Sequence, residues 1–163
     1  MKILVLSDTH RDLSTASNIL NTCRLGCDLV VHLGDTVRDC EGLKTIFPDL
    51  PFVGVRGNND LYSCDVDKEV FLDLDGIKTL ICHGHEYGVK RSTDQLLWRA
   101  QDKGADLVFY GHTHVAEKSV EGGIVLFNPG AVIEGNFGII HIHDSKIASA
   151  DIHRWDRLRG KLE

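Results

Sequence analysis

The sequence lacks the features that mark membrane, secreted and multidomain proteins. No apolar run approaches the ~20 residues that a membrane-spanning helix needs. The opening residues, MKILVLSDTH, carry no cleavable signal pattern, and no repeat, low-complexity segment or linker interrupts the 163 residues. We therefore expect a cytoplasmic protein that contacts no membrane and forms a single domain over residues 1–163.

Paired cysteines are also missing. The chain has five cysteines, at positions 23, 27, 40, 64 and 82, and none of them forms a Cys-x-x-Cys pair. An odd number without paired spacing argues against a disulfide framework. We expect small core or half-buried thiols in a reducing compartment.

The chain has no excess of positive charge. Its 18 basic and 24 acidic residues give a formal net charge of −6. A binder of long nucleic acids needs a broad basic surface, so we expect no such partner. Metal ions in a cleft would add local positive charge that this count omits, so the negative total does not exclude a small anionic substrate.

The first third of the chain alternates apolar runs with amphipathic segments. Asp12 can cap a helix with an apolar face at Leu13, Ala16, Leu20 and Cys23, and Gly26 ends it. This β-α-β-α-β alternation predicts parallel strands joined by right-handed crossovers. The expected strands cover residues 2–6, 28–33 and 52–56, and the second helix covers 37–46.

The remainder of the chain has a different pattern. Asp75-Gly76 separates two strand-like runs and predicts a hairpin. Ser92-Thr93-Asp94-Gln95 resembles a capping box for a helix that runs through Lys103 and ends at Gly104. A parallel half followed by an antiparallel half suggests two packed sheets with helices outside. The expected strands cover residues 68–74, 77–82, 106–110, 116–120, 124–128, 137–143 and 146–152.

Metal-ligand side chains follow five of the apolar runs. In open α/β sheets, ligands bind at the carboxyl ends of the strands, so we expect these clusters to meet at one edge. The five clusters are Asp8-Thr9-His10, Gly34-Asp35, Gly57-Asn58, His83-Gly84-His85 and Gly111-His112-Thr113-His114.

The residue types in these clusters suit two cations. Asp8 and His10 can reach one ion with an oxygen and a nitrogen, and Asp35 has two oxygens that can bridge ions ~3.5–4 Å apart. Asn58 adds a neutral oxygen. A mixed nitrogen and oxygen set without thiolate suits Mn²⁺, Fe, Co²⁺, Ni²⁺ or Zn²⁺ and suits Ca²⁺ poorly. The sequence therefore predicts a metal-dependent hydrolase.

All five clusters in this order resemble the calcineurin-like metallophosphoesterases, specifically their small single-domain bacterial and archaeal branch. The resemblance extends from Asp8 to Asn128-Pro129-Gly130. It implies an α/β fold, a four-layer α/β/β/α sandwich of two mixed sheets flanked by helices. It also implies hydrolysis of small phosphodiesters by a metal-bridging hydroxide, with phosphomonoesters or nucleotide derivatives as further candidate substrates.

The resemblance also implies a ligand set. Asp8, His10 and His114 would hold one ion, and Asp35 would bridge to the second. The second ion would be held by Asn58, His83 and His112. Manganese is the expected metal, with Ni, Fe, Co or Zn as alternatives.

The sequence departs from the family beside these ligands. Many relatives carry a histidine, thought to protonate the leaving group, where this chain has Asn59. Asparagine can donate a hydrogen bond but releases no proton near neutral pH. We expect Asn59 or His85 to contact the leaving group or the phosphate. Arg11, where relatives commonly have glycine, either contacts a phosphate or is a solvated loop cation.

Three further polar residues have ordinary explanations. We expect His32 to be a hydrogen-bonded core histidine, with orientation of a ligand as the alternative, and Asp39 to lie on a helix surface. Asp60 either orients a ligand or is simply a turn residue.

Two other functions remain open. A eukaryotic retromer subunit resembles this family but works as a protein-binding scaffold and has lost part of the metal-ligand set. This chain keeps a coordinating side chain at all seven ligand positions, which favours an enzyme. Exonuclease action ranks last because the chain has no basic track. Residues 137–153 could pair between two copies of the chain in a homo-oligomer, or a loop could cover that edge.

Overall fold

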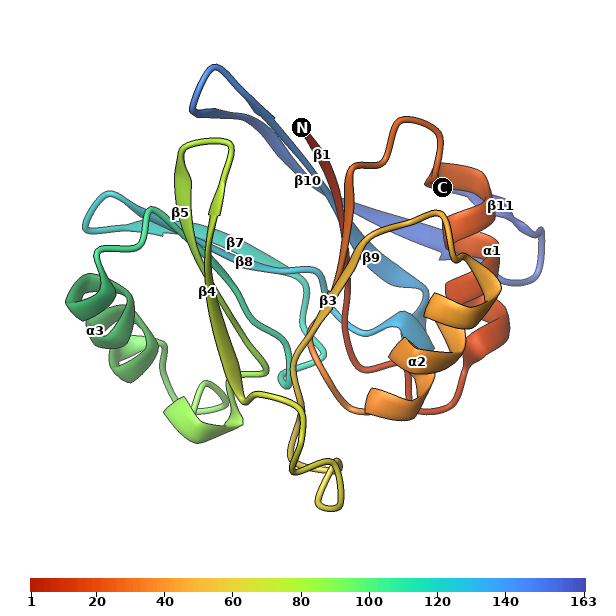
Figure 1. Cartoon of the computed structure of the whole chain (residues 1–163), viewed down its shortest axis with the longest axis horizontal. Helices are drawn as coiled ribbons and strands as arrows, with labels where there is room; N and C mark the ends of the chain where they lie inside the picture. Colours follow the sequence, from red (N-terminus) through yellow and green to blue (C-terminus); the bar gives the residue numbers. More distant parts are fainter.

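The strands of the computed structural model, which describes residues 1–163, form two sheets of six and five strands. The first sheet has the order β11-β10-β9-β1-β2-β3 and the second has the order β4-β5-β6-β8-β7. Figure 1 shows the two halves of the molecule, with α1 and α2 on one side and α3 on the other. The bounds are β1 Lys2–Leu6, β2 Leu29–His32, β3 Phe52–Gly54, β4 Glu69–Leu74, β5 Ile77–Cys82, β6 Leu107–Phe109, β7 Glu117–Glu121, β8 Ile124–Asn128, β9 Asn136–His143, β10 Lys146–Asp156 and β11 Lys161–Leu162.

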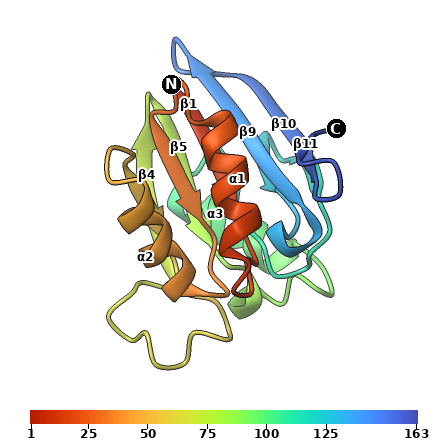
Figure 2. The same cartoon turned by 90° about the vertical axis from the view of Figure 1, so that its right-hand side faces the viewer.

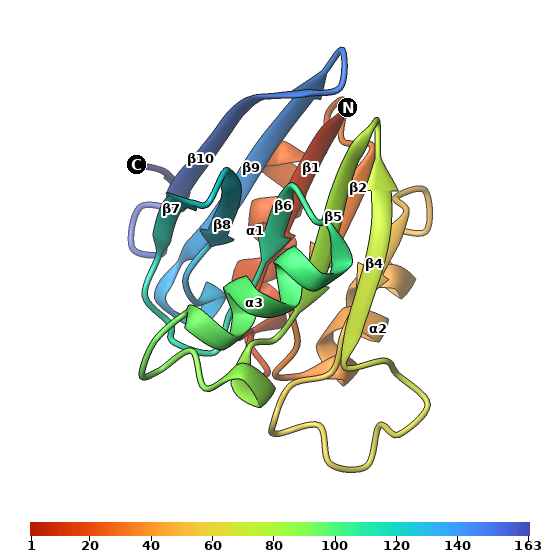
Figure 3. The ribbon, with the colours of Figure 1, turned by 90° about the vertical axis from the view of Figure 1, so that its left-hand side faces the viewer.

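Helices cover the outer faces of both sheets. Helices α1 (Leu13–Cys23) and α2 (Val37–Ile46) lie against the first sheet (Figure 2), and α3 (Asp94–Lys103) lies against the second (Figure 3). Two short 3₁₀ helices, η1 (His85–Tyr87) and η2 (Val132–Glu134), follow β5 and β8. The expected four-layer α/β/β/α sandwich is confirmed. None of the helices is long and apolar enough to cross a membrane.

The strand β1 is an unbroken apolar run because both of its faces are buried. Ile3 and Val5 of β1 face the core between the sheets, where they join residues such as Phe109 of β6. Leu4 and Leu6 face the opposite way and pack against α1. A third core lies between α3 and the second sheet. The strands that carry the predicted ligands are thus fixed from both sides.

Short-range signals predicted most element ends. The Asp12 carboxylate accepts a hydrogen bond from Thr15 N and caps α1, and Gly104 ends α3 with φ 65°. Asp75 and Gly76 have φ values of 54° and 85°, the positive pair that a two-residue hairpin turn requires. These predictions are confirmed.

Two expectations were wrong, and one short strand was not predicted. The capping box at α3 does not form, because the Ser92 hydroxyl donates to the Asp94 side chain and Thr93 makes no side-chain cap bond. The second half of the chain is not simply antiparallel. Strands β5 and β6 run parallel because α3 carries the chain across between them, and β8 runs parallel to β6 because β7 lies between them along the chain. A further short strand, β11, pairs with β10 near the end of the chain.

Candidate metal centre

The predicted ligands lie in loops of unusual backbone conformation. Non-glycine residues seldom adopt positive φ, and such strain is concentrated at functional sites because the surrounding structure must hold it. Five of the seven predicted ligands adopt it here: Asp8 (52°), His10 (45°), Asp35 (44°), His112 (69°) and His114 (62°). The fold therefore imposes these side-chain directions.

The first cluster joins the loop after β1 to the loop after β6. The Oδ1 atom of Asp8 lies 3.2 Å from His114 Nε2 and 3.8 Å from His10 Nε2, and the two Nε2 atoms are 3.2 Å apart. Two ligands bound to one ion at ~2.1 Å lie about 3.0–3.4 Å apart at octahedral or tetrahedral angles. The spacing of these three atoms is close to that of ligands around one cation.

The two oxygens of Asp8 are in different environments. Oδ2 accepts hydrogen bonds from the Ser7 hydroxyl at 2.5 Å and from His112 N at 3.1 Å. Oδ1 is buried and has no hydrogen-bond partner. A buried carboxylate oxygen without a partner is costly unless a cation compensates it. A metal ion at this position would provide the missing partner.

The second cluster centres on His83, which is fully buried at the end of β5. Its Nδ1 lies 2.7 Å from the Leu33 carbonyl oxygen, which can only accept, so in the neutral ring Nδ1 carries the proton and Nε2 has the free lone pair that a metal ion needs. Nε2 faces only oxygens, with Asn58 Oδ1 at 3.2 Å, Asp35 Oδ2 at 3.5 Å and Asp8 Oδ1 at 4.0 Å. A cation between these atoms would satisfy all of them.

The electrostatics of this cluster favour positive charge. Burial alone would lower the pKa of His83, but the carboxylates of Asp35 and Asp8 raise it above its ordinary value. Burial, with His83 nearby, lowers the pKa of His112 to about 4. The His112 imidazole is therefore neutral near pH 7, as metal ligation requires, and its ring centroid lies 5.0 Å from that of His83.

The structure thus brings all seven predicted ligands to one edge of the two sheets. Asp8 lies in both groups of potential ligands, one with His10 and His114 and the other with Asp35 and His83. The sequence had assigned Asp8 to one ion only and had identified Asp35 as the bridge. The Asp35 carboxylate accepts hydrogen bonds from Asn59 N at 2.9 Å and Asn59 Nδ2 at 2.7 Å.

Asp60 supports the ligand loops from behind. It is buried, and its two oxygens accept hydrogen bonds from the backbone N–H groups of Asp35 (3.0 Å), Val37 (2.7 Å) and Gly57 (2.8 Å). Of the two interpretations of Asp60, the structure favours the one in which it orients a ligand loop.

A second buried network holds the loop after β1. His32 Nδ1 accepts a hydrogen bond from Gly34 N at 3.2 Å, so Nε2 carries the proton and faces Thr9 Oγ1 at 3.2 Å. The Thr9 hydroxyl donates to Asp39 Oδ2 at 2.6 Å, and Arg11 N donates to the same oxygen. The core role of His32 is confirmed. The surface position expected for Asp39 was wrong, because it is buried and is the common acceptor of this loop.

The predicted substrate contacts lie at the rim of the centre. His85 begins η1, and its Nε2 is 3.4 Å from Glu86 Oε1 while its Nδ1 is buried without a partner. Burial, with His83 nearby, lowers the pKa of His85, so its ring is mainly neutral near pH 7. Arg11 is exposed.

Sequence reasoning assigned no role to three groups. Ser7 fixes Asp8, and a polar residue at the end of an apolar strand was the available signal. The side-chain amide of Asn128 donates to the Gly111 carbonyl oxygen at 3.1 Å and to Thr113 Oγ1 at 3.0 Å, which holds the fifth cluster. Arg56 and Lys68 line a cavity beside Asn58, and no sequence signal linked them.

Comparisons with known proteins find a matching family and relatives of similar sequence. The profile of the calcineurin-like phosphoesterase superfamily domain matches residues 1–154. A probable metallophosphoesterase of Bacillus subtilis, YsnB, is 33% identical over 133 residues, which cover 81% of this chain and 75% of that protein. A phosphodiesterase of Methanocaldococcus jannaschii is 30% identical over 152 residues, which cover 80% of this chain and 83% of that protein.

Solved structures show the same fold. A predicted phosphoesterase of Streptococcus pneumoniae superposes with a TM-score of 0.79 at 26% identity, covering 94% of this chain and 88% of that chain. Vps29 of Entamoeba histolytica, solved in complex with zinc, superposes with a TM-score of 0.77 at 22% identity, covering 100% of this chain and 96% of that chain. At that identity the second likeness concerns the fold alone.

Proposed function

The chain belongs to the calcineurin-like phosphoesterase superfamily, and on this premise we propose that it is a metal-dependent phosphodiesterase that hydrolyses small phosphodiesters. The observation that carries the proposal is the buried Oδ1 atom of Asp8, which has no hydrogen-bond partner and lies within 4.0 Å of three imidazole Nε2 atoms. A site of this kind fits a cation in chemistry and in spacing.

The proposed ligands form two sets. Asp8, His10 and His114 would hold one ion, and Asn58, His83 and His112 would hold the other. Asp35 would lie between the two sets, and Asp8 is also within reach of the second set. When bound, two divalent ions would lower the pKa of a water molecule toward neutrality and offset charge on the phosphoryl oxygens. Mn²⁺ is the proposed metal, because carboxylate, amide and imidazole ligands without thiolate suit it; Fe, Co²⁺, Ni²⁺ and Zn²⁺ suit the same set.

The protein's own groups orient the ligands. Asn59 donates two hydrogen bonds to Asp35, which fixes the direction of both carboxylate oxygens. The Leu33 carbonyl oxygen keeps the His83 proton on Nδ1, so that Nε2 faces the site. Ser7 leaves only one oxygen of Asp8 free. Each of these contacts lowers the cost of organising the centre when the ions bind.

The leaving group has no strong acid beside it in this proposal. Asn59 carries no titratable proton, and general-acid help typically contributes 10²–10⁴-fold. Esters with acidic alcohols should therefore react much faster than simple alkyl esters. If His85 supplies the missing proton, His85→Ala should lower the rate for poor leaving groups more than for good ones. An unchanged ratio of the two rates would remove His85 from that role.

The test is hydrolysis of bis(p-nitrophenyl) phosphate by chelator-treated protein, before and after addition of Mn²⁺, Fe²⁺, Co²⁺, Ni²⁺ or Zn²⁺. Activity should require metal and be lost in Asp35→Asn. The matched control is Asp65→Asn, an exposed acid on the loop after β3, which should keep full activity.

A binding scaffold is the alternative that the same experiment tests. The Vps29 likeness shows that this fold also occurs in proteins named for vacuolar sorting. Bound metal without turnover of any ester would favour a scaffold and contradict the proposed hydrolase. We also propose that the chain is one domain in the cytoplasm, where its five free cysteines would stay reduced.

A further inference from the structure

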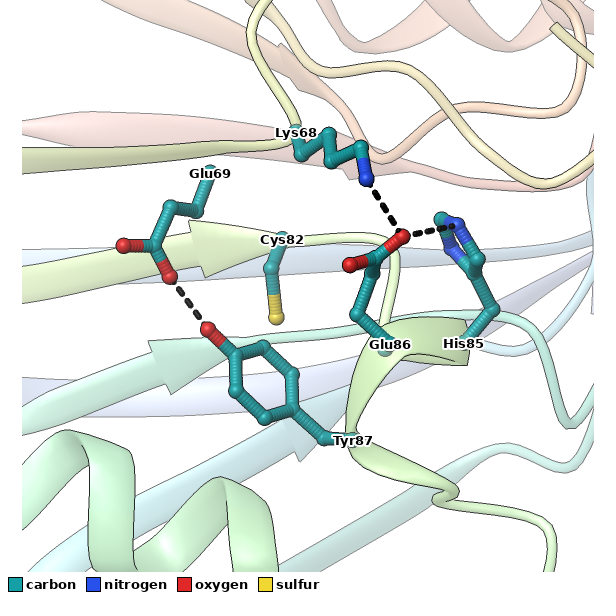
Figure 4. Close-up of a pocket in the computed structure, with 7 residues that line it drawn as sticks. Lys68, Glu69, Cys82, His85, Glu86 and Tyr87 are labelled. Atoms are coloured by element: carbon teal, nitrogen blue, oxygen red, sulfur yellow. Dashed lines mark hydrogen bonds and ion pairs between the residues drawn. The ribbon is translucent and has the colours of Figure 1, made fainter. Parts of the chain in front are cut away.

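A cavity opens beside the proposed metal centre, between the loop after β3 and η1. Its volume is about 370 Å³, and Asn58, one of the proposed ligands, forms part of its wall. Basic groups line it from both ends of the loop between β3 and β4, Arg56 two residues after β3 and Lys68 just before β4. A smaller cavity of about 140 Å³ adjoins it and shares Lys68 and Glu86 (Figure 4).

Arg56 is the unusual group in this cavity. Its Nε atom is buried and has no hydrogen-bond partner, although a guanidinium is a strong donor that normally finds one. Asp60, an acid of the same wall, has both oxygens committed to backbone N–H groups. The buried Nε–H of Arg56 thus has no acceptor within this chain, and the Arg56 side chain lines the cavity.

Lys68 forms an ion pair with the side chain of Glu86. Its Nζ donates to Glu86 Oε1 at 2.7 Å, and His85 Nε2 lies 3.4 Å from the same oxygen (Figure 4). The hydrogen bond from Lys68 holds the pKa of Glu86 below its usual range, with smaller contributions from His85 and Arg56. Glu86 is exposed on a short 3₁₀ turn, so a ligand carboxylate or phosphate could take the place of its side chain without disturbing the core.

We propose that Arg56 and Lys68 form a subsite for a second anionic group of the substrate. The substrate class is then a phosphodiester in which one alcohol carries a further carboxylate or phosphate. Arg56 offers a planar set of donors to two oxygens, and Lys68 offers a point charge. Glu86 occupies this subsite when no substrate is bound. The inference rests on the proposed function, because it specifies what that site accepts.

A pair of probes tests the subsite without turnover. They are 3-phosphonopropionate and its amide, which have the same size and differ by one negative charge. Calorimetric titration of the Mn²⁺-loaded protein should show roughly tenfold tighter binding of the carboxylate, the ratio expected for one charge-assisted hydrogen bond. A ratio near one in the wild-type protein would overturn the proposal.

Substitutions show which residues cause the difference in affinity between the carboxylate and the amide. Arg56→Met and Lys68→Met should each bring the ratio close to one, and Glu86→Gln should raise it. Lys44→Met is the matched control, because Lys44 also pairs with a glutamate at 2.7 Å but lies on α2; its ratio should stay at the wild-type value. If Arg56→Met fails to fold, Lys68→Met still decides the outcome, because an unchanged ratio there contradicts the subsite.

Measuring hydrolysis distinguishes the proposed phosphodiesterase activity from the proposed anionic subsite. The substrates are p-nitrophenyl 2-carboxyethyl phosphate and p-nitrophenyl 2-carbamoylethyl phosphate. Hydrolysis of both at equal kcat/KM would support the hydrolase and overturn the subsite. A large binding ratio for the phosphonates without hydrolysis of either ester would support the subsite and contradict the hydrolase.

Discussion

Asp60 joins three backbone segments, and its replacement by asparagine should destabilise the protein strongly. The carboxylate accepts hydrogen bonds from the loop after β2, from the loop after β3 and from Val37, the first residue of α2. The N-cap residue of that helix, Thr36, makes no side-chain cap bond. Asp60 therefore caps α2 from a distant part of the chain.

The magnitude follows from counting these bonds. Asparagine has the same shape but only one acceptor oxygen, so its NH₂ group must face one of the three N–H donors. One buried donor then loses its partner, at about 1–3 kcal/mol, and the two remaining bonds lose their charge-assisted part, at about 1 kcal/mol each. We expect a loss of about 3–5 kcal/mol in the free energy of unfolding, a large share of the ~5–15 kcal/mol typical of a domain.

The assay is urea unfolding of the chelated protein, followed by circular dichroism so that metal binding does not contribute. For a chain of this length, 1 kcal/mol corresponds to about 2–4 °C, so thermal melting should show a drop of about 6–20 °C. Asp65→Asn, an exposed acid on the same loop, is the control and should stay within about 0.5 kcal/mol of wild type.

The reasoning would be refuted by an Asp60→Asn protein that unfolds within 1 kcal/mol of wild type with an unchanged urea dependence. Such a result would mean that the three N–H groups find other acceptors at no cost. It would also remove the argument that Asp60 positions Asp35 and Gly57 for the metal centre.

Three further predictions concern the same framework. Asp8→Asn should leave the metal-free protein at least as stable as wild type, because it removes a buried charged oxygen without a partner. Mn²⁺ should no longer raise the melting temperature of this variant. A rise equal to that of wild type in scanning fluorimetry would contradict the assignment of Asp8 as a ligand. Gly57→Ala should cost about 1–3 kcal/mol in urea unfolding and weaken metal binding, because the added Cβ would overlap the Asp35 carboxylate. The hydrogen-bonded Arg99 guanidinium holds the pKa of Glu69 below its usual 4.5, so this pair stabilises the fold above pH ~4.5 and the contribution is lost as pH falls through the lowered value. Glu69→Gln should therefore cost about 1 kcal/mol at pH 7, with a difference from wild type that narrows in acid; a constant difference from pH 7 to pH 3 would refute it.

Much of the fold could be predicted from local signals. The strand β1 was visible as an unbroken apolar run because both of its faces are buried, by the second sheet and by α1. The turn at Asp75-Gly76 was visible because few other pairs accept two positive φ values. The capping box at α3 was not reliable, because the Ser92 hydroxyl had a nearer partner in Asp94.

The sequence also predicted which residues form the candidate site, but it did not predict the contacts between them. Polar residues directly after buried strands lie at the edge of the sheet, so this rule predicted that all seven ligand candidates would lie close together. Which oxygen of Asp8 is free depends on Ser7 and on the backbone of His112, which is 104 residues away. The burial of Asp39 likewise depends on Thr9, which is 30 residues away.

The sequence by itself determined that the ligand clusters follow strands, because short-range periodicity predicts the strands. It also determined the chemistry of their side chains and the family resemblance, because these depend on residue types and on their order along the chain. Only the tertiary structure decided that Asp8 lies in both ligand groups, that Asp60 caps α2, and that Arg56 and Lys68 face one cavity. The physical reason is the range of the forces involved. Hydrogen bonds and ion pairs act over a few ångströms in space, whatever the separation along the chain, so packing alone selects these partners.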